Sequence, residues 1–152
     1  MTVSHLRSVS GRATTGTPHD QQHLRSLVLY SGAASTAECV AGMSSLRALL
    51  PADTIAVLER HEAVEDYAHP EYLAAIETLY QRHLCRLDPK PPLLLESMTN
   101  MSAPVYTTMW GPNEFTCTGT LMAFDRTDRL GEVAVPTLIL CGRHDEVIPA
   151  CS

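Results

Sequence analysis

The chain has 152 residues, which is enough for one domain with one hydrophobic core. A formal net charge of −6, without any cluster of Lys and Arg, argues against nucleic acid or an anionic membrane surface as a partner. No apolar stretch approaches the ~20 residues that cross a bilayer, so we expect no membrane segment.

The N-terminal segment, residues 1–23, is rich in Ser, Thr, Gly and His and has few large apolar side chains. We expect this atypical segment to be poorly ordered. The first strand is predicted over Leu24–Ser31, where residues 27–30 form a continuous apolar run. Such a run is typical of a strand that is covered on both faces in a parallel sheet.

Helical periodicity occupies most of the chain after this strand. The pattern predicts helices over Ala41–Leu50, 52–66, Pro70–Leu87 and Leu93–Met101. Residues 103–115 contain two prolines and a glycine, which predicts a turn-rich segment around a short helix, and residues 119–125 predict a helical turn or two. We therefore expect a long, mainly helical region before the next strand.

A second strand is predicted over Thr137–Cys141, where another apolar run ends at Gly142. Asp145 and Glu146 follow it directly. In open α/β sheets, ligands and catalytic groups lie at the carboxyl ends of the strands. These two carboxylates therefore belong either to a functional site or to a solvated turn, and their spacing alone leaves both interpretations open.

Two strands of parallel type, separated by a long helical stretch, predict an α/β fold with a helical insertion. Two strands alone make a poor sheet, because their outer edges stay unpaired. The pattern is therefore typical of part of a larger fold.

Four segments carry a resemblance to a known family: Leu24–Ser35, Tyr80–Pro89, Val105–Leu121 and Asp128–Pro149. Together they resemble the C-terminal half of the proline iminopeptidase (prolyl aminopeptidase) family of α/β-hydrolases. The resemblance implies a partial α/β-hydrolase core formed by residues 24–32 and 129–152, with two late parallel strands. Residues 33–128 would then form the helical cap over the active site.

The resemblance also implies roles for four residues. Asp145 matches the acid of the catalytic triad, and Glu114 and Glu146 match the carboxylates that bind the substrate's amine. Tyr106 matches an aromatic contact at the same end of the substrate. The family's serine lies on a G-x-S-x-G turn, which has no match here, since Ser31, after the first strand, lacks the flanking glycines. The family's histidine has no match here either.

The family's reaction is the release of N-terminal proline from peptides through an acyl-enzyme. Without the serine and the histidine, we expect a fragment that is inactive alone. A non-catalytic module that binds an amine or a partner chain is the alternative. Another capped α/β-hydrolase, such as an esterase or epoxide hydrolase, explains the strands and Asp145 but not the pair Glu114 and Glu146.

We expect neither a cofactor nor a metal ion. His61, Glu62 and Glu65 lack the second histidine of a zinc motif and predict an exposed helical face. The five cysteines include no Cys-x-x-Cys pair and are odd in number, which favours reduced thiols and a cytoplasmic protein.

Overall fold

The computed structural model describes residue 21 and residues 23–147. The elements, in chain order, are β1 (Leu27–Tyr30), α1 (Thr36–Arg47), α2 (Ala52–Glu62), α3 (Pro70–Leu79), η2 (Tyr80–Leu84), α4 (Pro92–Asn100), α5 (Ala103–Met109), η3 (Thr120–Ala123), η4 (Thr127–Glu132) and β2 (Thr137–Leu140). The prediction of poor order for residues 1–23 lies outside the described residues, apart from Gln21 and His23.

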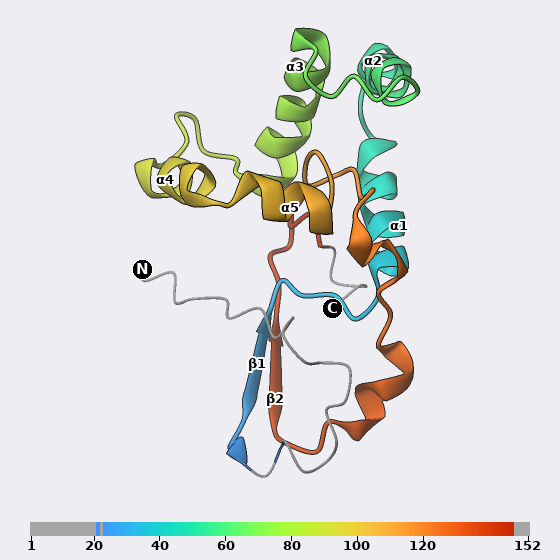
Figure 1. The fold of residues 1–152 in the computed structure, drawn as a ribbon. Helices are drawn as coiled ribbons and strands as arrows, with labels where there is room; N and C mark the ends of the chain where they lie inside the picture. The colour runs from blue at the N-terminus through green and yellow to red at the C-terminus, as the bar shows by residue number, and fades with distance from the viewer. Residues whose placement is uncertain (1–20, 22, 148–152) are drawn as a thin grey trace.

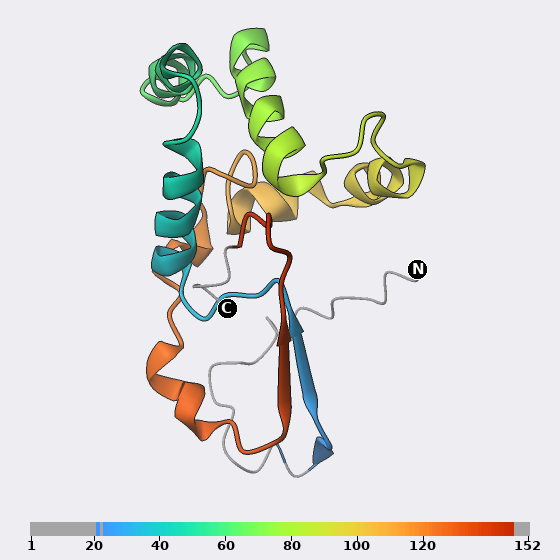
Figure 2. The ribbon, with the colours of Figure 1, turned by 180° about the vertical axis from the view of Figure 1, so that it is seen from behind.

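The two predicted strands are confirmed and pair in parallel. Leu27 lies opposite Thr137, and Tyr30 lies opposite Leu140. Both strands point their carboxyl ends toward the helices, as Figures 1 and 2 show from opposite sides. Because the strands are in register, the segments that follow Tyr30 and Leu140 leave the sheet side by side.

The predicted coverage of these strands on both faces is wrong for the part of the chain that the structure describes. The side chains of Val28 and Leu138 are 59% and 52% exposed, and the other residues of both strands are also exposed, apart from the half-buried Leu27. No described helix packs extensively on the strand pair, which projects away from the helical region in both views (Figures 1 and 2). The apolar composition therefore predicts where the strands lie in the sequence, but not whether other elements cover them.

The hydrophobic core lies in the helical region, between α2 and α3. Leu58 and Leu79 are fully buried, and Tyr72 is 1% exposed. The complete buried cluster is Leu50, Leu58, Tyr72, Ala75, Ile76 and Leu79. The helical region thus has its own interior, some distance from the strands.

Local signals set the ends of the first helices. The Ser35 hydroxyl accepts a hydrogen bond from the Glu38 backbone N–H at 3.4 Å, so α1 begins at Thr36, earlier than the predicted Ala41. His69 caps α3 in the same manner, and Pro70 occupies its first turn. These caps satisfy backbone N–H groups that a helix start leaves without an intrahelical partner.

The prediction of one helix over Pro70–Leu87 is only partly right. The α-helical part ends at Leu79, and residues 80–84 form a wider π-helical turn. The Cys85 backbone N–H donates to the Tyr80 carbonyl at 2.8 Å, five residues back, and Cys85 itself is extended. Apolar spacing cannot distinguish this wider turn from an α-helix, because both keep similar faces inward.

The remaining helices lie close to their predicted positions. α2 ends at Glu62 rather than near residue 66, and Glu65 has a left-handed backbone with φ of 55°. The longest described α-helix, α1, has 12 residues, and no described helix is long and apolar enough to cross a bilayer.

Two leucines of α3 test the location of the core. Leu79 is fully buried, whereas Leu73, on the same helix, is 54% exposed. We expect Leu79→Ala to reduce the free energy of unfolding by about 2–5 kcal/mol, because it removes buried contacts and leaves a cavity. Leu73→Ala should change it by about 0.5 kcal/mol or less. Urea denaturation followed by circular dichroism measures both, and equal losses would contradict this core.

Candidate functional site

The carboxyl ends of β1 and β2 form one side of the candidate site. The Ser31 backbone N–H donates to the Leu140 carbonyl at 2.8 Å, which continues the strand pairing by one residue. The chain after β2 then turns, and the Asp145 backbone N–H donates to the Gly142 carbonyl at 3.3 Å. This turn carries Asp145 and Glu146 toward the helical region.

The half-buried carboxylate of Asp145 is held by three donors. Its Oδ2 accepts hydrogen bonds from the Ser31 hydroxyl at 2.7 Å and from the Gly142 backbone N–H at 3.3 Å. Its Oδ1 accepts one from the Val147 backbone N–H at 3.0 Å. Hydrogen bonds to an ionised carboxylate are stronger than neutral ones, so this side chain has one fixed orientation.

The loop between α5 and η3 forms the other side and carries Glu114. The loop folds back on itself, since the backbone N–H groups of Thr118 and Gly119 both donate to the Trp110 carbonyl, at 2.8 and 2.6 Å. The Trp110 indole N–H donates to the Glu114 carbonyl at 3.0 Å. Gly111 allows this close return, because a Cβ there would lie 2.1 Å from the Thr116 carbonyl oxygen.

A polar network ties this loop to the helical core. The Asn113 amide donates to the Tyr72 hydroxyl at 2.8 Å, and that hydroxyl donates to Glu62 Oε1 at 3.3 Å. Arg47 forms an ion pair with the same carboxylate at 2.7 Å, and the Thr116 hydroxyl lies 3.2 Å from that of Tyr72. Residues from α1, α2 and α3 therefore fix the loop on which Glu114 lies.

The structure brings Glu114, Glu146 and Tyr106 together. Burial raises the pKa of Glu146 to about 7, and the charges of Asp145 and Glu114 add to the rise. Burial also raises the pKa of Glu114, although the neighbouring Tyr106 hydroxyl acts in the opposite direction. Burial, together with the charges of Glu114 and Glu146, raises the pKa of Tyr106. These residues, which are far apart in sequence, therefore affect one another directly.

This cluster of Tyr106, Glu114 and Glu146 offers hydrogen-bond acceptors and negative charge. The Tyr106 hydroxyl is buried near the Glu114 carboxylate, whose pKa it lowers, although no described atom meets it at full hydrogen-bond geometry. None of the ion pairs among the described residues involves Glu114 or Glu146. Carboxylates in such surroundings favour a bound proton or a bound cation. The arrangement is chemically suited to a ligand ammonium group.

Sequence reasoning missed Ser31, Tyr72 and Asn113, which position the site. Ser31 is the first residue after β1. Because β1 and β2 were predicted to be parallel neighbours, the residues that follow them, Ser31 and Asp145, could have been expected to lie close together. Tyr72 and Asn113 resemble ordinary helix and loop residues in sequence. Their hydrogen bond joins positions 41 residues apart, and only the packing of the loop on α3 brings them together.

A second cluster, at the tip of α2 and α3, contains metal-ligating side chains. His61, His69 and Glu71 offer ligand atoms that all lie within 4.8 Å of one another. However, the two imidazole rings stack at 4.2 Å with an interplanar angle of 25°, so their lone pairs run side by side rather than converging. Arg60 also pairs with Glu71. This geometry is that of cap packing, and the prediction of an exposed face at His61 is wrong, since His61 is 6% exposed.

Comparisons with known proteins show which sequences this chain is similar to. No protein-family model matches the chain. It is 41% identical over 128 residues to the proline iminopeptidase of Thermoplasma volcanium, and the matched region covers 84% of this chain and 43% of that protein. It is 38% identical over 128 residues to the proline iminopeptidase of Saccharolobus solfataricus, with coverage of 84% and 41%.

Solved structures agree with the sequence matches. The fold superposes on the crystal structure of VinJ with a TM-score of 0.79 and 42% identity, over 84% of this chain and 44% of that one. It superposes on the proline iminopeptidase of Mycobacterium smegmatis with a TM-score of 0.76 and 42% identity, over 88% and 46%. The chain therefore spans less than half the length of these relatives.

The raised pKa of Glu146 predicts how stability depends on pH. The folded state binds more protons than the unfolded state between the ordinary carboxyl pKa of 4.5 and about 7, so stability should fall as pH rises through this window. We expect Glu146→Gln to flatten this slope, because it removes the group that titrates. Urea denaturation across the window measures the effect. The exposed Glu96→Gln is the control, and an unchanged slope in Glu146→Gln would exclude the explanation.

Two glycines test the support of the Glu114 loop. Gly111→Ala forces a Cβ into the Thr116 carbonyl oxygen, whereas a Cβ at Gly131 meets open space. We expect Gly111→Ala to lower the free energy of unfolding by about 1–3 kcal/mol, and Gly131→Ala to change it by about 0.5 kcal/mol or less. Thermal denaturation compares them, and equal stability of the two variants would show that the loop is looser than described.

Proposed function

Because the chain belongs to the proline iminopeptidase family of α/β-hydrolases, we propose that it carries the amine-binding part of a serine-type prolyl aminopeptidase site. The substrate would be a peptide with an N-terminal proline. The observation that carries the proposal is the convergence of Glu114, from the α5–η3 loop, with Glu146, from the turn after β2. Residues 33–128, with this loop, would form the helical cap, and residues 24–32 and 129–152 would form part of the core.

The proposed role of Glu114 and Glu146 is to hold the cationic amine of the substrate. An enzyme that removes N-terminal residues must recognise this charge, and charge-assisted hydrogen bonds to carboxylates do so. A bound ammonium would favour the ionised form of Glu146, whose pKa is raised to about 7 in its absence. Tyr106 would contact the same end of the substrate through its buried hydroxyl.

The proposed role of Asp145 is that of the triad acid. Such a carboxylate fixes the tautomer of the histidine base and stabilises the imidazolium as it forms. The hydrogen bonds from Ser31, Gly142 and Val147 support this role, because they fix the carboxylate at the end of β2. His144 is no substitute for the histidine, because no hydrogen bond or ion pair among the described residues joins it to Asp145.

Two further expectations remain proposals. Among the described residues, Cys85, Cys117 and Cys141 are free thiols, which supports a reducing compartment such as the cytoplasm. The net charge of −6 supports a small peptide as the ligand rather than nucleic acid.

Isothermal titration calorimetry with prolinamide tests the amine site. We expect measurable binding, weakened at least about tenfold in Glu114→Gln and in Glu146→Gln, because each variant removes one charged acceptor. The exposed Glu96→Gln should bind like the unchanged chain. Absence of heat with the unchanged chain, or equal binding by all variants, would refute the proposed site.

An activity assay separates binding from turnover. The reaction needs a serine nucleophile and a histidine base, and the 152 residues contain no G-x-S-x-G motif for the serine. We expect this chain to bind prolinamide without hydrolysing proline p-nitroanilide. Robust release of nitroaniline by the purified chain, abolished in Asp145→Asn, would show instead that these residues hold a complete catalytic site.

A further inference from the structure

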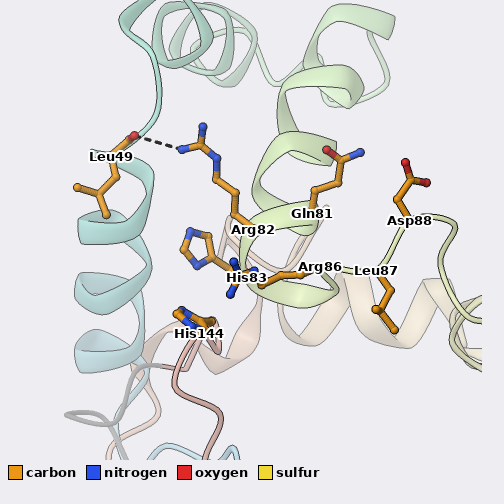
Figure 3. Close-up of a pocket in the computed structure, with 8 residues that line it drawn as sticks. All are labelled: Leu49, Gln81, Arg82, His83, Arg86, Leu87, Asp88 and His144. Atoms are coloured by element: carbon orange, nitrogen blue, oxygen red, sulfur yellow. Dashed lines mark hydrogen bonds between the residues drawn. The ribbon is translucent and has the colours of Figure 1, made fainter.

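His83, on η2, lies where the helical region meets the turn after β2. Together with His144 of that turn, it lines a groove of about 540 Å³ (Figure 3). The Nδ1 atom of His83 is buried and has no hydrogen-bond partner among the described residues. A buried polar atom without a partner costs free energy, so stability alone does not account for a histidine at this position.

The position of His83 is fixed by the segments on either side of it. The Arg82 guanidinium donates a hydrogen bond to the Leu49 carbonyl at 3.3 Å, which ties η2 to the chain after α1 (Figure 3). Lys90 forms an ion pair with Glu77 at 2.6 Å, which holds the segment after η2 against α3. The imidazole therefore projects from a stretch of backbone that is anchored at both ends.

The His83 ring contacts the loop that carries Glu114. It meets the Phe115 ring edge-on, with the ring centroids 6.4 Å apart and an interplanar angle of 65°. Phe115 directly follows Glu114 in the chain, and its ring also lies 6.1 Å from that of Tyr80, another residue of η2. Aromatic rings at such distances attract one another beyond the burial of their apolar area. Two rings of η2 therefore hold the loop in place.

The same imidazole acts on the turn that carries Glu146. Burial lowers the pKa of His83, whereas the His144 backbone carbonyl acts in the opposite direction, because it favours a ring proton. The charges of Arg82, Arg86 and His144 strengthen the fall. His83 is therefore neutral near pH 7 and brings no positive charge to the neighbouring carboxylates. Its effect on them must come from its position.

We propose that His83 is a positioning residue of the amine site, which sets the approach of Glu114 to Glu146 by contacting both of the segments that carry them. The inference rests on the proposed function and adds one residue to its site. Binding sites need their polar groups held within about 0.5 Å of the productive geometry. A single neutral side chain that contacts both segments meets this need, because Phe115 adjoins one carboxylate and His144 precedes the other by two residues.

Two measurements on the 152-residue chain test this role. The first is the pKa of Glu146, followed without ligand by NMR of the carboxyl carbons. The second is the affinity for prolinamide, measured by calorimetry. We expect His83→Ala to lower the pKa of Glu146 from about 7 toward the ordinary 4.5, because water reaches a carboxylate that is held less closely. It should also weaken prolinamide binding about tenfold.

His83→Gln is the conservative variant, since glutamine keeps an N–H donor of similar reach and has no titratable ring. We expect it to restore both the pKa of Glu146 and the affinity to nearly the values of the unchanged chain. Losses in His83→Gln equal to those in His83→Ala would show that the imidazole itself acts on the ligand, and would overturn the positioning role.

His69→Ala is the matched control, because His69 caps α3 at the end opposite η2 and its removal lowers stability away from the site. Both values should stay unchanged in this variant. An equal fall of the Glu146 pKa in His69→Ala, or an unchanged pKa in His83→Ala, overturns the inference. If the unchanged chain does not bind prolinamide, the proposed function fails, whereas the titration of Glu146 still decides whether His83 positions the two acids.

Discussion

The candidate site depends on the burial of two carboxylates, Glu114 and Glu146, neither of which forms an ion pair with any described residue. Burial raises the pKa of both groups, and at Glu146, where the charges of Asp145 and Glu114 add to the rise, the pKa reaches about 7. Left free, such side chains would turn toward water, where ionisation costs less. Their burial therefore requires that each be held in place by a rigid part of the fold.

The two supports are built differently. Glu146 follows the parallel strand pair, whose register also places the Ser31 hydroxyl against Asp145. Glu114 lies on a loop tied by Asn113 and Tyr72 to the helical core, where Arg47 neutralises Glu62. The buried charge of the scaffold is thus paired, as buried charges generally must be, whereas the charge of the site is not. This difference supports the proposed binding of a cationic ligand at Glu114 and Glu146.

The sequence alone determined both strands, most helix positions and, through the family's motifs, the four candidate residues of the site, because apolar periodicity, proline positions and motif identity are local properties. The tertiary structure decided the rest. It showed that the strands are exposed, that His61 is buried, and that Ser31 holds Asp145 across 114 residues of sequence. Burial and long-range hydrogen bonds depend on which surfaces meet in the folded chain, and no local pattern specifies that.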